Sequence, residues 1–303
     1  MRDAIGDYRV LERIGAGETA EVYRARDTRL GRTAAIKVLT SDVAMDPAHG
    51  PAFVTEANLA ASLGHPNLAA LYEIDEQDGR PHLVFEFVPG QTLSAVLAGH
   101  PLNPRQAIDF GIQIADGLAE AHAAGLAHRM LRPDKVIVTP KGTAKTIDFG
   151  LGHYAMAVAR RAAASGTAVS ALAYWAPEQT SGGPGDHRSD MWALGLMLIE
   201  MLTGRPPVAG QQPSTSSLPA ELRPLVARMI TVGPERRPQS AATVAAELRG
   251  TAAALDAKRD AAPAVPVPVV RKPAAPAAAF PAWAIILIAL AGGAVLVWLA
   301  AAS

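Results

Sequence analysis

Two glycines near the N-terminus are spaced as in loops that hold phosphate. Gly15 and Gly17 form a G-x-G pair, and the missing side chains let backbone N–H groups approach phosphate oxygens. Most isolated pairs of this kind are simple turns, so the residues that follow decide the interpretation. Lys37 follows inside an apolar, β-prone run of residues 35–38. A lysine in such a strand, at this distance from a glycine pair, favours a functional cation over a solvated surface charge.

The segment of residues 128–138 resembles the catalytic loop of protein kinases, whose pattern is H-R-D-L-x-x-x-N. In that pattern the Asp accepts the proton of the attacking hydroxyl and the Asn holds a magnesium ion. Here Met130 and Lys135 stand at those positions, and Arg132 replaces the catalytic-loop lysine. The resemblance therefore predicts the kinase frame with no catalytic residue intact. The retained frame residues are His128, Arg129, Leu131 and Pro133.

Other motifs occur in the order found in bacterial Ser/Thr kinases of the eukaryotic (Hanks) type, from about residue 8 to residue 250. Residues 14–23 resemble the glycine-rich loop, with Ala20 in place of its third glycine. Glu56, on the helix expected after the lysine strand, matches the glutamate that pairs with the lysine in kinases. Residues 83–90 resemble the strand that ends in the hinge between the lobes, where the backbone binds adenine.

The activation segment carries two further motifs. Asp148-Phe149-Gly150 stands at the place of the magnesium-binding D-F-G, and residues 174–178 resemble the A-P-E that closes the segment. Arg237 is placed to pair with Glu178. The resemblance implies a nucleotide-binding set made of Ile14, Gly15, Gly17, Val22, Ala35, Lys37, Glu56, Glu86, Val88 and Ile137. It implies Asp148 as metal ligand, with Lys135 at the second ligand position, and a structural set of His128, Arg129, Phe149, Glu178, Asp190 and Arg237.

Loss of the base at position 130 does not by itself exclude phosphate transfer. General-base positioning contributes about 10²- to 10⁴-fold in rate, and a loose transition state depends more on electrostatics. Lys135 removes a metal ligand but brings a positive charge, which could stand where the second ion would and pair with Asp148. Asp134 is one residue away on an extended segment, so its side chain points to another face. The implied cofactor is ATP or ADP, with room for a single magnesium ion.

Two departures agree with the changed loop. Kinases carry G-T-x-x-Y before A-P-E, and here Ser170 and Ala171 replace the Gly and the Thr. The connection after residue 203 reaches residue 218 without the helix that family members have there, so a helical dock for substrates is expected to be missing. The alternative is an ordinary loop deletion.

The activation segment is expected to be a regulatory surface. In the family the arginine at Arg129 meets a phosphorylated residue of this segment, and Ser165, Thr167 and Ser170 lie within reach along the chain. A phosphate added there by a partner kinase would form charge-assisted hydrogen bonds that order the loop. The alternative is that Arg129 only packs the loop against the long helix.

Composition limits the remaining possibilities. The 303 residues suffice for one bilobal core, and the formal net charge of +0 shows no basic stripe of the kind that binds nucleic acid. The chain has 0 cysteines, so no disulfide framework or thiolate metal site exists.

The composition changes at the end of the kinase-like region. Residues 251–281 form an Ala/Pro-rich linker, in which residues 251–260 could be a last helical turn or two and residues 261–281 favour an extended tether. Residues 282–302 are uncharged and apolar over about the length that spans a bilayer, with a tryptophan near each end. Arg271 and Lys272 precede this run. The positive-inside rule then predicts a single-pass, tail-anchored protein of the inner membrane, with the kinase-like domain facing the cytoplasm.

The predicted fold class is α+β. It is a bilobal protein-kinase-like fold, with a small, mainly antiparallel β lobe with one helix (residues 8–88) and a larger α-helical lobe (residues 89–250), plus one C-terminal transmembrane helix. Residues 1–7 are an N-terminal tail. The predicted function is a membrane-anchored pseudokinase that binds ATP and acts as a regulatory scaffold for a partner kinase or membrane complex. Two alternatives stay open: an active but atypical Ser/Thr kinase, and an interaction module that binds no nucleotide.

Overall fold

The computed structural model describes residues 3–17, 19–39, 50–167 and 170–261. The chain divides into two compact units, residues 1–260 and 261–303. The predicted membrane segment and most of the predicted tether lie outside the described residues. Within the described part, no helix combines the length and the apolar character needed to cross a membrane.

The described strands are β1 (Ala4–Ile5), β2 (Tyr8–Ala16), β3 (Ala20–Asp27), β4 (Thr33–Leu39), β5 (Leu71–Gln77), β6 (Arg80–Glu86), β7 (Gln91–Thr92), β8 (Val136–Val138) and β9 (Ala144–Thr146). The described helices are α1 (Gly50–Ala61), α2 (Leu93–Leu97), α3 (Pro104–Ala123), α4 (Gly152–Ala164), α5 (Pro177–Thr180), α6 (His187–Thr203), α7 (Arg223–Met229) and α8 (Ala241–Ala261). Short 3-10 turns are η2 (Pro133–Lys135), η3 (Ser170–Tyr174) and η4 (Pro234–Arg236).

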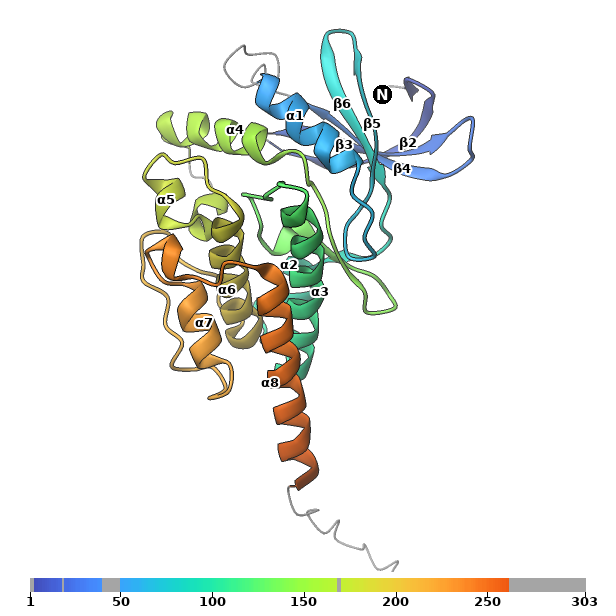
Figure 1. The fold of residues 1–303 in the computed structure, drawn as a ribbon. Coiled ribbons are helices and arrows are strands. Elements are labelled where there is room, and N and C mark those ends of the chain that lie inside the picture. The colour runs from blue at the N-terminus through green and yellow to red at the C-terminus, as the bar shows by residue number, and fades with distance from the viewer. Residues whose placement is uncertain (1–2, 18, 40–49, 168–169, 262–303) are drawn as a thin grey trace, which may run out of the picture. The chain divides into compact units, whose positions relative to one another are not determined.

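The N-terminal lobe is an antiparallel sheet with α1 beside it (Figure 1). The strand order is β1-β2-β3-β4-β6-β5. Alternate residues of β4 point to opposite faces of this sheet. Ile36 and Val38 are buried with Tyr8 and Val84 on one face, whereas Lys37 between them lines a cavity. The alternation of β4 thus places the Lys37 ammonium at the cavity, whereas Ile36 and Val38 pack in the sheet's core and stabilise it.

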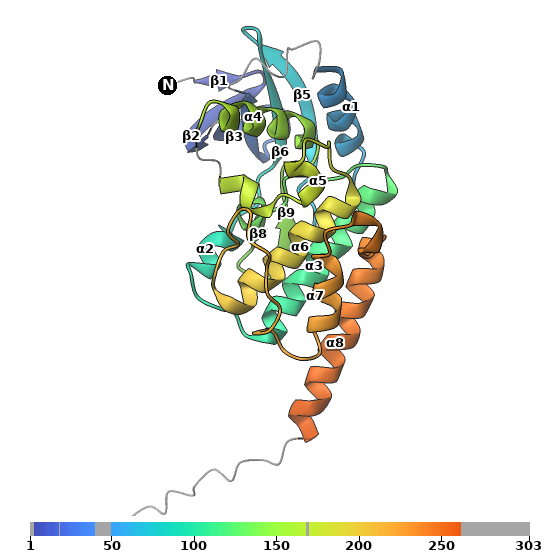
Figure 2. The same cartoon turned by 90° about the vertical axis from the view of Figure 1, so that its left-hand side faces the viewer.

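The C-terminal lobe is built around α6, which is buried along most of its length and lies among α3, α7 and α8 (Figure 2). Local chemistry fixes its ends. The Asp186 carboxylate accepts a hydrogen bond from the backbone N of Arg188 at 2.8 Å, and Gly204 ends the helix in the left-handed conformation, with φ of 69°. Gly111 lets α3 approach α6 closely, since a Cβ there would lie 2.9 Å from Leu198 Cδ2. The predicted bilobal fold is confirmed.

Two boundaries differ from the sequence prediction. The predicted tail takes part in the sheet, because β1 pairs with β2. The segment assigned to the linker begins as helix, because α8 continues through Gly250 to Ala261, in agreement with the last helical turns allowed for residues 251–260. No proline interrupts residues 251–261, and a glycine inside a helix costs only about 1 kcal/mol. The connection of residues 204–222 contains no helix, in agreement with the expected missing dock.

The predicted pair of Glu178 and Arg237 joins the end of the activation segment to the loop before α8. The Arg237 guanidinium donates to Glu178 Oε1 at 2.7 Å and to Oε2 at 2.8 Å. It also donates to the backbone oxygens of Thr231, Arg188 and Val232. Burial raises the pKa of Glu178, but the hydrogen bonds from Arg237 and Ser189 outweigh this and lower it.

We predict that Arg237→Ala destabilises the protein by about 3–5 kcal/mol, because it leaves a partly buried carboxylate and several carbonyl groups without their donor. The matched control is the neighbouring Arg236→Ala, whose side chain is 78% exposed and whose loss is expected to change stability by less than about 0.5 kcal/mol. Urea unfolding of both variants measures the difference. Equal costs for the two substitutions would show that the Arg237 contacts do not stabilise the fold.

Candidate nucleotide site and catalytic loop

The catalytic loop is held by the frame residues that the sequence retains. Asp190, fully buried in α6, accepts hydrogen bonds from the backbone N of His128 at 2.8 Å and of Arg129 at 2.7 Å. The His128 ring lies edge-on to Phe149, with centroids 4.8 Å apart. Arg129 has a φ of 61°, a conformation that persists where surrounding contacts hold it. The loop therefore keeps its backbone shape although its reactive residues are exchanged.

Met130, at the place of the catalytic base, lies in an apolar cluster. It is 8% exposed and is buried together with Met156, Ala159, Ala171 and Trp175. The indole Nε1 of Trp175 donates to Met130 Sδ at 3.2 Å. Ala171, expected in place of a threonine that braces the loop, belongs to the same cluster. The position is thus part of the hydrophobic core beneath α4.

The neighbouring acid does not replace the missing base. The Asp134 carboxylate lies 2.7 Å from Arg132 Nε, so its charge is compensated by the residue at the catalytic-loop lysine position. Arg132 also donates from Nη1 to Ser170 Oγ at 3.1 Å. Asp134 nevertheless lines the same two cavities as Lys37 and Lys135, which does not agree with the expectation that it points to another face.

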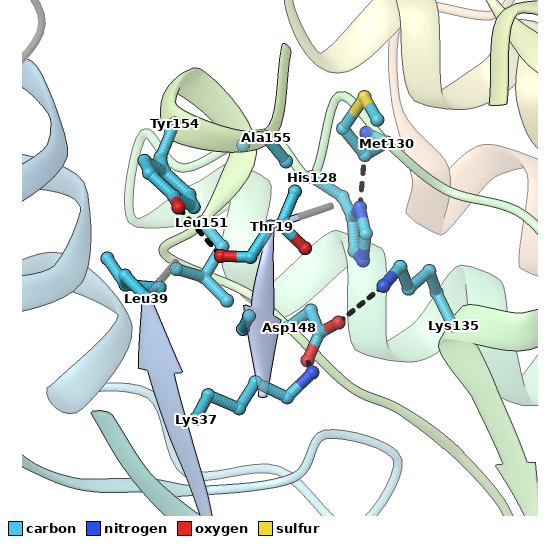
Figure 3. A pocket seen from close by; sticks show the side chains of 12 residues that line it. Thr19, Lys37, Leu39, His128, Met130, Lys135, Asp148, Leu151, Tyr154 and Ala155 are labelled. Atoms are coloured by element: carbon cyan, nitrogen blue, oxygen red, sulfur yellow. Dashed lines mark hydrogen bonds and ion pairs between the residues drawn. The ribbon is translucent and has the colours of Figure 1, made fainter. Parts of the chain in front are cut away.

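Asp148 lies between two lysines (Figure 3). Lys135 Nζ donates to Asp148 Oδ2 at 2.7 Å, and Lys37 Nζ donates to Oδ1. Burial alone would raise the pKa of Asp148, but the charges and hydrogen bonds of Lys135 and Lys37 hold this pKa well below its usual range. Asp148 is therefore an ionised carboxylate that two ammonium groups already neutralise. The suggested direct Lys135–Asp148 pair is present.

The donor set around Asp148 does not fit the magnesium ion that the kinase pattern implies. Magnesium takes oxygen ligands in near-octahedral geometry, and an ammonium group has only donors to offer. Both Asp148 oxygens already accept hydrogen bonds from lysines. Among the described residues, no group of three or more His, Cys, Asp or Glu side chains could hold a metal ion.

Glu56 is not at the nucleotide site, which corrects the expected Lys37–Glu56 pair. Its carboxylate accepts hydrogen bonds from Arg129 Nη1 and, at 3.0 Å, from the backbone N of His153. The ring Nδ1 of His153 lies 2.7 Å from Glu56 Oε1. Burial raises the pKa of Glu56, but His153 and Arg129 outweigh it and lower this pKa. The physical reason for the correction is that Lys37 pairs with Asp148, so Glu56 accepts hydrogen bonds from Arg129 and His153 instead.

These contacts also change the expected role of Arg129. Besides Glu56, its guanidinium donates from Nε to the backbone oxygen of Gly185 at 3.1 Å. Among the described residues, the Arg129 guanidinium contacts Glu56, Gly185 and Ala127, whereas Ser165 and Thr167 are exposed. The alternative that Arg129 packs the loop against α6 is the closer description of the contacts.

The activation segment forms a helix, α4, that the sequence analysis missed. Figure 1 shows α4 beside α1, and the Tyr154 hydroxyl donates to the backbone oxygen of Thr19 in the glycine-rich loop at 2.6 Å. The helix begins against the catalytic loop, since a Cβ at Gly152 would lie 2.9 Å from the His128 oxygen. An alanine-rich stretch without proline, with Met156 and Ala159 three residues apart, is the signal that could have predicted it.

A cavity of about 520 Å³ opens between the glycine-rich loop and the hinge, within the size range of small-ligand sites. Phe85 lines it at the end of β6. A second cavity of about 400 Å³ adjoins the glycine-rich loop and is lined by Gly17, Met130 and the same two lysines. The predicted residues that line the larger cavity are Ile14, Gly15, Val22, Ala35, Lys37, Glu86, Val88, Ile137, Lys135 and Asp148.

Lys145 is a further residue that sequence reasoning missed. Its ammonium donates to both carboxylate oxygens of Glu86, at 2.7 and 2.8 Å, and so ties the hinge to the strand before Asp148. The carboxylate of Glu86 is therefore paired with Lys145 at the wall of the larger cavity. Its partner lies 59 positions away in the sequence, which is why a local pattern could not predict the pair.

Comparisons with known proteins agree with this geometry. The family model described as "Protein kinase domain" matches residues 8–248. The chain is 40% identical over 217 residues to a probable serine/threonine-protein kinase of Streptomyces coelicolor, covering 69% of this chain and 32% of that protein. It is 37% identical over 208 residues to the serine/threonine-protein kinase PrkC of Bacillus subtilis, covering 68% of this chain and 32% of that protein.

Solved structures give the same result. The crystal structure of the Mycobacterium tuberculosis PknI kinase domain superposes with a TM-score of 0.70 at 26% identity, covering 84% of this chain and 99% of that chain. The chain is also 34% identical to the serine/threonine-protein kinase PknB of M. tuberculosis, covering 80% of this chain and 42% of that protein. It spans about a third to two fifths of the length of these curated relatives.

We predict that Met130→Asp loosens α4 and lowers stability by about 2–4 kcal/mol, because it places a carboxylate in an apolar cluster. The control Met130→Leu keeps the volume and should cost less than about 1.5 kcal/mol. Hydrogen exchange across Gly152–Ala164 measures the loosening, and urea unfolding measures the stability. If the carboxylate variant leaves exchange in α4 unchanged, Met130 does not hold the helix.

Proposed function

This chain belongs to the protein kinase family, among the bacterial Ser/Thr kinases of the Hanks type, and from this premise we propose that it is a pseudokinase. In this proposal it binds a nucleotide, transfers no phosphate, and regulates a protein partner in bacterial signalling. The family membership confirms the resemblance to bacterial Ser/Thr kinases that the sequence motifs indicated.

One observation carries the proposal: the catalytic-base position is the buried thioether of Met130 within an apolar cluster. A thioether does not accept the proton of an attacking hydroxyl, which removes a contribution of about 10²- to 10⁴-fold. The other acid of the loop, Asp134, is paired with Arg132. The catalytic loop therefore has no free carboxylate at the base position to activate a hydroxyl, and the site is suited to binding a ligand.

Nucleotide binding is supported by the cavity of about 520 Å³. Apolar residues from both lobes line its inner part, and the two lysines with Asp148 lie at its phosphate end. The backbone of the hinge faces the same cavity, with the Glu86 carboxylate paired with Lys145 at its wall. This arrangement suits an adenine ring at the hinge and phosphates at the lysines.

An active, atypical kinase is the second candidate function. It is favoured by the retained Lys37 and Asp148, and by curated relatives of up to 40% identity that are named serine/threonine-protein kinases. A third candidate, an interaction module without nucleotide, is favoured by the neutralised state of Asp148. The two measurements below distinguish all three.

We also propose that residues 282–302, which lie outside the described residues, anchor the chain in the inner membrane. The support is their uncharged, apolar composition and length. The kinase-like domain would then face the cytoplasm, because Arg271 and Lys272 flank the run.

We predict that the full-length protein transfers no phosphate to itself above the level of Lys37→Ala, while ATP and ADP raise its melting temperature in proportion to the logarithm of their concentration. Incorporation of labelled phosphate and a thermal shift assay measure the two effects. Robust transfer that Lys37→Ala abolishes would establish the active kinase instead. The absence of any thermal shift at millimolar nucleotide, with and without magnesium, would establish the interaction module.

We predict that removal of residues 280–303 releases a soluble, folded protein from the membrane fraction, because a run of this length makes insertion effectively irreversible. Fractionation with a high-salt wash measures this. A full-length protein found in the soluble fraction would contradict the proposed anchor. A truncated protein that stays in the pellet would show that the kinase-like domain itself binds a membrane partner.

A further inference from the structure

Two lysines from different lobes meet at one carboxylate. Lys37 comes from β4 of the N-terminal lobe, and Lys135 ends the η2 turn that leads into β8 of the C-terminal lobe. Their side chains are only 11% and 20% exposed, and that of Asp148 is 6% exposed. Charges at such positions are screened weakly by salt and water. Their sum therefore acts strongly on any ligand that enters.

The charge balance at this point is positive. Lys37, Lys135 and Asp148 together leave one positive charge where the phosphates of a nucleotide would lie, and Asp134, which lines the same cavities, is compensated by its pair with Arg132. Each ammonium has three donors, of which one is used on Asp148. Both lysines line the two cavities on either side of this cluster. The remaining donors can therefore bind phosphate oxygens directly.

A divalent ion meets an unfavourable site here. It would approach a net positive cluster and would have to displace Lys135 to bind Asp148, or Arg132 to bind Asp134. In the kinase pattern the residue at this position is a neutral Asn, which recruits the ion and adds no charge of its own. Lys135 supplies instead a fixed charge that needs no recruitment.

We propose that this site binds the polyphosphate of a nucleoside di- or triphosphate without a divalent metal, with the Lys135 ammonium in the place of the cation. The inference rests on the proposed function, because it presupposes that a nucleotide enters the cavity. It goes further in naming the form of the ligand, which is the metal-free polyanion and not its magnesium complex.

Calorimetric titration of the full-length protein with ADP and with ATP tests the proposal. Each titration is run with EDTA and with excess magnesium chloride. We expect affinity in EDTA to equal or exceed affinity in magnesium, because magnesium lowers the charge of the free nucleotide and meets the Lys135 ammonium at the site.

Three variants isolate the role of Lys135. Lys135→Asn should weaken binding in EDTA by about 10- to 100-fold, the value of a hydrogen bond to a charged group, and magnesium should restore part of the loss. Lys135→Arg keeps the charge and should keep most of the metal-free affinity. The matched control is Lys141→Asn, at an exposed turn residue, which should bind as the wild type does.

The outcomes separate the two proposals. Binding by the wild type that requires magnesium overturns the metal-free site and leaves nucleotide binding intact. Equal affinities of wild type and Lys135→Asn in EDTA also overturn it, because Lys135 then takes no part. Absence of binding under both conditions overturns nucleotide binding itself, and the metal-free site with it. If Lys135→Asn does not fold, the wild-type pair of titrations and Lys135→Arg still decide.

Discussion

The contact of Asp148 with Lys37 and Lys135 determines the arrangement of the rest of the site. Asp148 is buried, and a buried carboxylate is stable only if opposite charges compensate it. Because Lys37 is used for this, Glu56 on α1 must find other partners, and it pairs with Arg129 and His153. One ion pair therefore decides which partners the side chains of Glu56, Arg129 and His153 take.

The pairing of Glu56 with His153 also positions α4. His153 stands near the start of α4, so its contact with Glu56 fixes that end of the helix to α1. Further along, Met156 and Ala159 pack on Met130, which a catalytic aspartate would not allow without burying a charge. The apolar residue at the base position thus has a positive structural role. Loss of the base and the helical activation segment are two aspects of one packing arrangement.

Function follows from which groups remain exposed to the cavity. The hinge backbone and the two lysines face it, whereas the base position is buried and Asp134 is paired. A site of this kind can bind a polyanion without activating a hydroxyl. In the proposed function, binding would act on structure, because a ligand at Lys37 and Lys135 would contact both lobes at once, and the pairing of these lysines with Asp148 leaves Glu56 to Arg129 and His153.

The sequence by itself determined the family, the bilobal fold and the identity of the exchanged residues, because these depend on ordered motifs with local spacing. It also suggested the Lys135–Asp148 pair, because the kinase resemblance puts the two residues at the two metal-ligand positions. It could not determine which carboxylate Lys37 would choose, because Glu56 and Asp148 are both compatible with its position along the chain. It also missed α4 and the pair of Lys145 with Glu86. Only the tertiary structure decided these points, because competing ion pairs are settled by burial, and burial depends on how segments far apart in the sequence pack together.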